Sequence, residues 1–397
     1  MIPIKPASRV DGVRYAIRDI VLLSDQVKKS GKQILSLNIG DPCQFDFDVP
    51  ELLKEATLDA MRRGLNGYSP ASGIPEAVEA IGKEAEKLYG IRTIRNIFVS
   101  TGGSEAIDLC LTALLEPGEN VLIPAPGYPL YSAILSKLQA VENYYYLDEE
   151  DGWQPNIDDI VSRIDSRTRA IVIINPNNPT GSVCTREKLE QVAEVAREHN
   201  LLVFMDEIYS KLILDDLPHY SLASLDPELP VVTFNGLSKN YMAPGWRIGW
   251  AVFSGDPELI DNYAENVNKI VRARLCANHP EQYAIKPALQ SGDGHLEGAV
   301  EKLRQRRDLT FQRLNEIKHI SCVKPLGAFY AFPRLEIEDT DEEWVKGLLF
   351  ETGVLVVHGS GFGEKEGTRH FRVVFLPEME TLGSAYDKIE RYMEKHY

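Results

Sequence analysis

The chain has 397 residues, of which 44% are hydrophobic, and its formal net charge is −16. This acidic balance argues against nucleic acid or an anionic membrane as a partner. No apolar run reaches the length of a membrane span and the N-terminus lacks the apolar core of a secretory signal, so we expect a cytoplasmic protein.

Three segments near the N-terminus, residues 15–31, 51–64 and 74–90, carry apolar residues at helical spacing. Each closes with a glycine, the residue that most often ends a helix. We therefore expect three amphipathic helices before the first strand of the main sheet.

From residue 96 onward, short apolar runs alternate with helical stretches. The runs lack strict polar–apolar alternation, which is typical of strands buried on both faces. They are residues 96–100, 120–124, 142–147, 170–175, 201–207, 231–236 and 247–253. With helices such as 104–115 between them, they predict an α/β fold with a mostly parallel, seven-stranded sheet sandwiched by helices. Ligands bind such sheets at the carboxyl ends of the strands.

After residue 277 the pattern is helical through 297–317 and then returns to short strands. This order predicts a second, smaller α+β domain. We expect residues 46–280 to form the large domain and residues 281–397 the small one. Residues 1–45 are expected to pack with the small domain.

The first predicted strand runs into Gly102, Gly103 and Ser104, which precede a helix. Glycines let a backbone approach a ligand closely, and a helix N-terminus offers free N–H groups, so this turn can hold a phosphate. The alternative is an ordinary strand-to-helix turn in which Ser104 caps the helix.

Asp206 and Tyr209 lie at the end of another strand. Asp206 follows a run of five apolar residues, where a carboxylate costs several kcal/mol unless it is paired. It is either a helix cap, half of a structural ion pair, or the partner of a cationic ligand. Tyr209 would lie near Asp206 if the chain turns helical there; otherwise it is a core aromatic residue.

Lys239 follows the strand 231–236, although lysine is among the residues least often buried. A desolvated lysine of lowered pKa can form a Schiff base. The segment 175–181, "NPNNPTG", makes a rigid turn whose asparagine amides either point to one side or bond their own backbone. Taken together, these strand ends predict pyridoxal 5′-phosphate, with Lys239 on its aldehyde, Asp206 on its pyridinium nitrogen and the Gly-Ser turn on its phosphate.

The ordered motifs "TGGSEAI", "PAPGYPLY", "NPNNPTG", "DEIY" and "SKNYMAPGWRIGW" resemble the class I and II aminotransferases of PLP fold type I. The resemblance covers nearly the whole chain, from "LNIGDP" to "FRVVF". Within the family, "YAIRDIV", "FNGLSK" and "RLCANHPEQYAI" resemble the bacterial and archaeal alanine aminotransferases. This implies an aminotransferase with ping-pong kinetics, with alanine as amino donor and 2-oxoglutarate as acceptor.

The resemblance also implies a role for each motif residue. Lys239, Asp206 and Tyr209 would be catalytic. The cofactor would be bound by Gly103, Ser104, Glu105, Tyr128, Asn178, Asp206, Tyr209, Ser238, Lys239, Arg247 and, from the neighbouring subunit of a homodimer, Tyr68. The substrate would be bound by Gly40, Asn178, Arg372 and Arg18, with Arg372 on its α-carboxylate. Without the resemblance, Arg372 is equally well explained as a surface cation on an edge strand.

Several positions depart from the family pattern or have no assigned role. Many relatives carry a hydroxyl residue where this chain has Gly236, and a proline where it has His358. The arginines that bind a distal carboxylate in aspartate aminotransferases have no clear counterpart, since Arg272 and Arg274 align ambiguously.

Other functions on the same fold stay open at this point. Donors could be branched-chain, aromatic or varied, and a carbon–sulfur lyase or an aminocyclopropane-carboxylate synthase-like enzyme would use the same cofactor without an amino acceptor. A PLP-sensing transcriptional regulator would need a DNA-binding module ahead of the family-like region, which here starts almost at residue 1. A purely structural protein would have no use for Asp206 and Lys239 at strand ends.

The five cysteines and eight histidines show no CxxC or HxxxH-type spacing, so we expect free thiols and no metal site.

Overall fold

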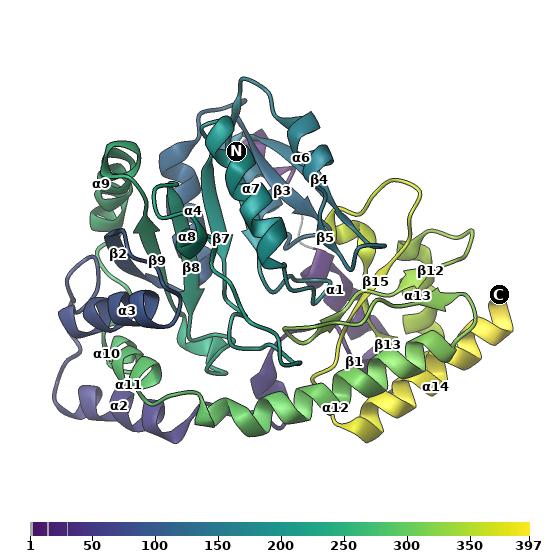
Figure 1. Ribbon diagram of the computed structural model, residues 1–397. Helices are drawn as coiled ribbons and strands as arrows, with labels where there is room; N and C mark the ends of the chain where they lie inside the picture. The colour runs from purple at the N-terminus through teal and green to yellow at the C-terminus, as the bar shows by residue number, and fades with distance from the viewer. Residues whose placement is uncertain (1–2, 14–15, 30) are drawn as a thin grey trace.

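The computed structural model describes residues 3–13, 16–29 and 31–397 of the chain. Figure 1 shows two parts side by side: a larger part built around one long sheet, and a smaller part that holds the C-terminus. The long helix α12 (Gly294–Glu316) runs beneath both parts in this view and connects them.

The large sheet has eight strands in the order β2-β9-β8-β7-β6-β3-β4-β5. They are β2 (Ile94–Thr101), β3 (Asn120–Ala125), β4 (Val141–Asp148), β5 (Gln154–Pro155), β6 (Thr168–Ile174), β7 (Leu202–Asp206), β8 (Val231–Gly236) and β9 (Ile248–Ser254). Only β9 and β5 run antiparallel to their neighbours. The predicted mostly parallel sheet is confirmed, with eight strands instead of seven, because the two-residue β5 is too short to show a hydrophobic pattern.

Helices cover both faces of this sheet. The helices of this larger part are α2 (Glu51–Arg62), α3 (Pro75–Lys87), α4 (Gly103–Leu114), α5 (Leu130–Leu138), α6 (Ile157–Arg163), α7 (Arg186–Glu198), α8 (Leu222–Leu225), α9 (Pro257–Ala273), α10 (His279–Gln282) and α11 (Ile285–Gln290), of which α2 packs on α10 and α11. In β7, Val203 and Met205 join one apolar cluster, with α3, α7 and α11, whereas Phe204 joins another, with α4, α5 and α9. Because both faces are buried, the carboxyl edge is where the sheet can present functional groups.

The smaller part combines short strands with α12, α13 (Asp341–Thr352) and α14 (Met379–His396). Strands β11 (Tyr330–Ala331), β15 (Phe371–Val374) and β14 (Val357–His358) form one antiparallel sheet, and β10 (Ile320–Ser321) pairs with β12 (Arg334–Leu335). From the N-terminal segment, β1 (Leu35–Ser36) pairs with β13 (Val354–Leu355), and α1 (Ala16–Lys29) contacts β14. Short 3-10 helices are η1 (Ser8–Val10), η2 (Pro42–Gln44), η3 (Pro244–Trp246) and η4 (Gly359–Phe362). The domain boundaries remain predictions.

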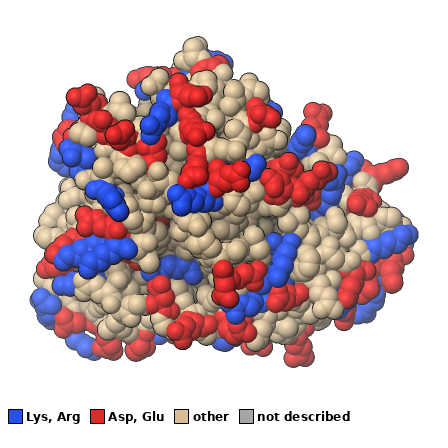
Figure 2. Space-filling model, in the orientation of Figure 1, with Lys and Arg blue, Asp and Glu red and all other residues tan. Residues whose placement is uncertain are grey.

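The surface in Figure 2 carries acidic and basic side chains interspersed, without a broad basic patch on this face. Among the helices that the structure describes, none combines the length and the apolar character that a membrane crossing requires.

Candidate active site

A cavity of about 750 Å³ lies at the carboxyl edge of the large sheet. Loops from five parallel strands meet there, including those of β3 and β6. These two strands are neighbours in the sheet, and the chain runs outward from them in opposite directions. Most of the predicted site residues line this one cavity: Gly40, Gly103, Ser104, Tyr128, Asn178, Asp206, Tyr209, Ser238, Lys239, Arg247 and Arg372. The chain thus brings together residues that are up to 332 positions apart (Gly40 to Arg372).

Lys239 enters the cavity from the loop after β8 and donates from Nζ to the Gly40 carbonyl at 2.7 Å. Burial lowers the pKa of this lysine to about 8, and the positive charges of Arg247 and Arg372 act in the same direction. Asp41 acts against them. A lysine of this pKa is partly neutral near pH 7 to 8, so it can act as a nucleophile and as a base.

Buried side chains anchor the loop that carries Lys239. The Asn240 side chain accepts from the Lys211 amide at 3.2 Å and donates to Ser210 and Asn235 at 3.3 and 3.1 Å. Asn235 in turn donates to Ser210 at 3.1 Å. These bonds tie the residue that follows Lys239 to the end of β8 and to the loop after β7.

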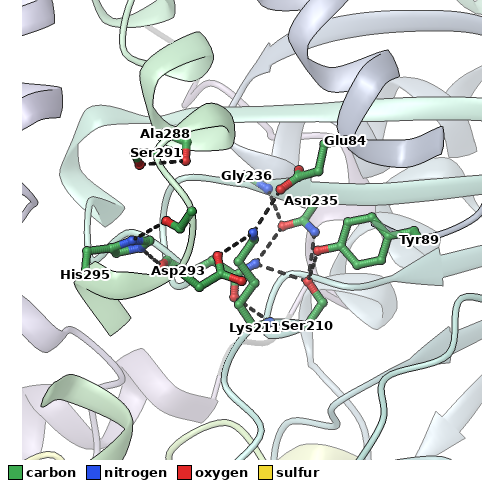
Figure 3. Close-up of polar contacts among 12 residues, drawn as sticks. Glu84, Tyr89, Ser210, Lys211, Asn235, Gly236, Ala288, Ser291, Asp293 and His295 are labelled. Atoms are coloured by element: carbon green, nitrogen blue, oxygen red, sulfur yellow. Dashed lines mark hydrogen bonds and ion pairs between the residues drawn. The ribbon is translucent and has the colours of Figure 1, made fainter. Parts of the chain in front are cut away.

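Lys211 is a buried cation within the same network, and Figure 3 shows it between Glu84 and Asp293. Its Nζ lies 3.0 Å from the Glu84 carboxylate and 2.8 Å from that of Asp293. Burial lowers the pKa of Lys211, but the carboxylates outweigh burial and raise it above its ordinary value, so the lysine stays charged. His295, at the start of α12, lies 3.1 Å from the Asn240 carbonyl, which links the Lys239 loop to the connection between the two parts.

Asp206 is 5% exposed, and its carboxylate accepts from the Tyr131 hydroxyl at 3.2 Å and from the Ile208 amide at 3.3 Å. Burial raises the pKa of Asp206 to about 6 in spite of these bonds. No lysine, arginine or histidine in the described part of the chain forms an ion pair with it. A buried carboxylate of this kind suits a cationic ligand, such as a protonated ring nitrogen.

An anion cradle lies where α4 begins. The amides of Gly103 and Ser104, in the first turn, have no acceptor within the helix. A Cβ added to Gly102 would lie 2.7 Å from the Arg247 Cζ, so the guanidinium packs directly on this turn. A Cβ added to Gly249 would lie 2.5 Å from the Gly102 carbonyl carbon, so β9 also needs a glycine here. Backbone N–H groups and a guanidinium at a helix N-terminus can hold a phosphate.

Arg372 is 1% exposed and lines the cavity. It donates to Asn178 Oδ1 at 3.0 Å and to the Asn38 carbonyl at 2.5 Å. Its Cζ lies 4.7 and 4.8 Å from the ring centroids of Tyr330 and Phe362. This enclosure between two aromatic rings fixes a planar fork that suits a carboxylate.

Two tyrosines of the site were not predicted from the sequence. Tyr131 bonds Asp206, and Tyr330 lies 2.8 Å, hydroxyl to hydroxyl, from Tyr209. Tyr131 lies in an apolar helix and Tyr330 in an apolar strand, where a tyrosine is normally a core residue. The only available clue was that a buried hydroxyl needs a partner.

The three remaining predicted residues are not among the described residues that line the cavity. The Tyr68 side chain is 81% exposed and does not line the cavity of its own subunit. The Glu105 amide donates to the Gly102 carbonyl at 3.1 Å, and its carboxylate accepts from the Thr101 amide at 2.7 Å. The side chain of Arg18 lies outside the described residues.

The positions without a clear role lie away from the main cavity. Arg272 is exposed and pairs with Glu265 at 2.8 Å, whereas Arg274 donates to the Val99 carbonyl at 2.5 Å. His358 Nδ1 lies 2.8 Å from the Ser360 hydroxyl. No cluster of metal-ligating side chains is found among the residues that the structure describes.

The departure at Gly236 has a steric reason. A Cβ added to Gly236 would lie 2.7 Å from the Ile248 carbonyl oxygen and 2.9 Å from the Gly249 Cα. Only glycine fits this approach of β8 to β9, so the hydroxyl that many relatives carry has no room here.

Comparison with known proteins shows the family to which a chain with this fold and site belongs. The sequence profile of aminotransferase class I and II matches residues 32–389. The chain is 38% identical to the glutamate-pyruvate aminotransferase AlaA of Escherichia coli (strain K12) over the full length of both. It is 40% identical to the alanine aminotransferase of Mycobacterium tuberculosis (strain ATCC 25618 / H37Rv), over 98% of this chain and 92% of that one.

A solved structure gives the same result. The alanine aminotransferase from Pyrococcus furiosus superimposes with a TM-score of 0.96 at 40% identity, over 99% of this chain and 100% of that chain. The chain therefore belongs to the class I and II aminotransferases, and the predicted fold class and enzyme class are confirmed.

Proposed function

We propose that the chain is a pyridoxal 5′-phosphate-dependent alanine aminotransferase that moves the amino group of L-alanine to 2-oxoglutarate. One observation carries the proposal: a lysine of lowered pKa, a buried carboxylate without a cationic partner among the described residues, and an anion cradle line the same cavity. The names of the relatives support alanine as a substrate.

The donor set of the cavity fits this cofactor. The cradle would take the phosphate, with the amides of Gly103 and Ser104 and the side chains of Ser238 and Arg247. Asp206 would hold the ring nitrogen, Asn178 and Tyr209 would donate to the phenolic oxygen, and Tyr128 would cover one face of the ring. Bound through Lys239, the cofactor supplies a sink for the electrons of the substrate's Cα–H bond.

Lys239 would be the proton carrier of the reaction. Its Nζ, no longer bonded to the cofactor, would take the proton from the substrate Cα and would later return a proton to the cofactor's aldehyde carbon. A pKa of about 8 suits both steps because the neutral and charged forms are both accessible near neutral pH. Asp206 would keep the ring nitrogen protonated throughout, and its burial prevents water from screening that charge.

Arg372 would orient the substrate. Its planar fork would grip the α-carboxylate, as would the backbone near Gly40, so that the Cα–H bond faces Lys239. Arg18 stays a candidate for the side-chain pocket. Because both half-reactions would use the same residues in opposite directions, we expect ping-pong kinetics.

We further propose a homodimer in which Tyr68 of each subunit reaches the phosphate of the neighbouring site. Its 81% exposure in one subunit supports this arrangement. Inactive Lys239→Ala and Tyr68→Ala variants, unfolded and refolded together in equal amounts, would form hybrid dimers with one intact site, about a quarter of all sites. Recovery of activity on mixing would support a shared site, whereas no recovery would refute it.

The first test is the visible absorbance of the purified protein loaded with pyridoxal 5′-phosphate. We expect a yellow protein, loss of the colour on adding L-alanine alone, and its return on adding 2-oxoglutarate. Lys239→Ala is the control and should not give the lysine-bound colour. Bleaching by another amino acid but not by alanine would replace the donor. A transaminase without acceptor releases at most one 2-oxo acid per site, so repeated turnover that releases ammonia without any acceptor would indicate a lyase. A protein that stays colourless would refute the proposal.

A further inference from the structure

Tyr330 lies between two groups of the site that have separate proposed tasks. It belongs to β11, which pairs with the strand that carries Arg372, and it is 2% exposed. Its side chain lines the main cavity. A Cβ added to Gly40 would collide with the Tyr330 hydroxyl, so this hydroxyl also reaches the backbone segment that accepts from Lys239.

The two ends of Tyr330 make different contacts. Its hydroxyl lies 2.8 Å from the Tyr209 hydroxyl, and the two rings meet edge to face at 87°. Its ring face lies against the Arg372 guanidinium, with 4.7 Å between Cζ and the ring centroid. A single rigid side chain therefore touches the residue expected at the cofactor's phenolic oxygen and the residue expected at the substrate's carboxylate.

We propose that Tyr330 is a positioning residue that couples the carboxylate-binding Arg372 to the cofactor-binding Tyr209. The inference rests on the proposed function, because it assigns Tyr330 its role through those two residues. Its hydroxyl orients the Tyr209 hydroxyl, and its ring holds the guanidinium in place, so both groups keep one mutual geometry.

The direction of the hydrogen bonds follows from the chemistry. The phenolic oxygen of the cofactor is an acceptor, so Tyr209 must donate its proton to it. Its own oxygen then accepts from the Tyr330 hydroxyl, and each bond in such a chain strengthens the next. Burial raises the pKa of Tyr209 well above its ordinary value, which keeps it a neutral donor.

The test compares Tyr330→Phe, which removes only the hydroxyl, with Tyr330→Leu, which also removes the ring. Tyr386→Phe is the matched control, because Tyr386 is likewise buried and its hydroxyl lies 2.7 Å from the Thr310 hydroxyl, in the smaller part. Each protein is loaded with pyridoxal 5′-phosphate. The measurements are the pH midpoint of the change in visible absorbance, the Kd for propionate (alanine without its amino group), and the melting temperature.

A donor to the phenolic oxygen draws electron density from it, so a weaker donor lets the lysine-bound nitrogen keep its proton to higher pH. We expect Tyr330→Phe to raise the midpoint, by less than Tyr209→Phe does, and the double variant to match Tyr209→Phe alone. Its Kd for propionate should stay within about twofold, whereas Tyr330→Leu should weaken propionate roughly 3- to 30-fold through loss of the cation–π contact. Tyr386→Phe should change only the melting temperature.

Several results would overturn the proposed coupling by Tyr330. A wild-type midpoint in Tyr330→Phe, or equal shifts in Tyr330→Phe and Tyr386→Phe, would overturn the coupling and leave the proposed function intact. Additive shifts in the double variant would also overturn it, as would unchanged propionate binding in Tyr330→Leu. A wild-type protein that takes up no chromophore would overturn the proposed function, and with it this inference, before any variant is compared.

Discussion

Replacing Lys239 by methionine is expected to change how the stability of the cofactor-free protein depends on pH. In the folded protein, burial lowers the pKa of Lys239 from 10.5 to about 8. In the unfolded chain the lysine has its ordinary pKa. Between about pH 8 and 10.5 the unfolded state therefore binds more protons than the folded state, so the folded state loses stability as the pH falls through this range. The cost is full below about pH 8 and disappears as the pH rises through the unfolded pKa.

The size of the effect follows from the same pKa values. The pKa falls by about 2.5, and each pKa unit corresponds to about 1.36 kcal/mol, so the cost near pH 7 is about 3 kcal/mol. Methionine carries no charge, so the substitution removes this cost. It also removes the bond from Nζ to the Gly40 carbonyl, which subtracts about 1 kcal/mol at every pH. We expect Lys239→Met to be more stable than wild type by about 2 kcal/mol at pH 7 and no more stable near pH 10.

The assay is urea denaturation of both proteins at several pH values between 7 and 10, with equal m values as the check on comparable unfolding. Lys83→Met is the matched control, because Lys83 lies exposed on α3 and, among the described residues, forms its ion pair only with Glu79 on the same helix. Its stability difference from wild type should stay nearly constant with pH. A constant difference for Lys239→Met as well would refute the lowered pKa of Lys239 in the folded protein.

Three further changes test other parts of the site. Asp206→Asn is expected to slow the alanine half-reaction at least about 100-fold in stopped-flow absorbance, and an unchanged rate would remove Asp206 from the mechanism. Arg372→Lys is expected to raise KM for alanine and for 2-oxoglutarate about tenfold or more, because lysine cannot grip a carboxylate with a planar fork; unchanged KM values would place the carboxylate elsewhere. Lys211→Met is expected to lower the free energy of unfolding by about 3–5 kcal/mol, because Glu84 would stay buried without its cation. The control is the double variant with Glu84→Gln, in which the lost stability should return. A single variant as stable as wild type would contradict the reasoning.

The parts of the site that the sequence predicts are those in which a residue contradicts its local pattern. Lys239 and Asp206 are ionisable residues at the ends of apolar strands, and such residues need a partner or a function. Gly102 and its neighbours occur where a strand turns into a helix. The strand order could not be read from these patterns, yet the carboxyl-edge rule was enough to expect the residues together.

The remaining residues follow their local pattern, so nothing in the sequence marks them. Tyr330 and Tyr131 lie in apolar segments where a tyrosine packs well, and only the fold shows which hydroxyl each one meets. The Asn240 side chain bonds residues up to 30 positions away, and Lys211 pairs with a glutamate 127 positions earlier in the chain. Such pairings depend on tertiary packing, which residue propensity does not encode.

In the cofactor-free protein, the two key charges of the cavity stay apart at an electrostatic cost. Burial moves the pKa of Asp206 up to about 6 and that of Lys239 down to about 8, so each charge is held at a cost. Pairing them directly would relieve both costs, but Lys239 instead bonds the Gly40 carbonyl, and Asp206 bonds Tyr131 and Ile208. A ligand with a cationic nitrogen at one end and an aldehyde near the other would relieve both at once. Binding of pyridoxal 5′-phosphate should therefore stabilise the folded protein strongly as well as equip it for transamination.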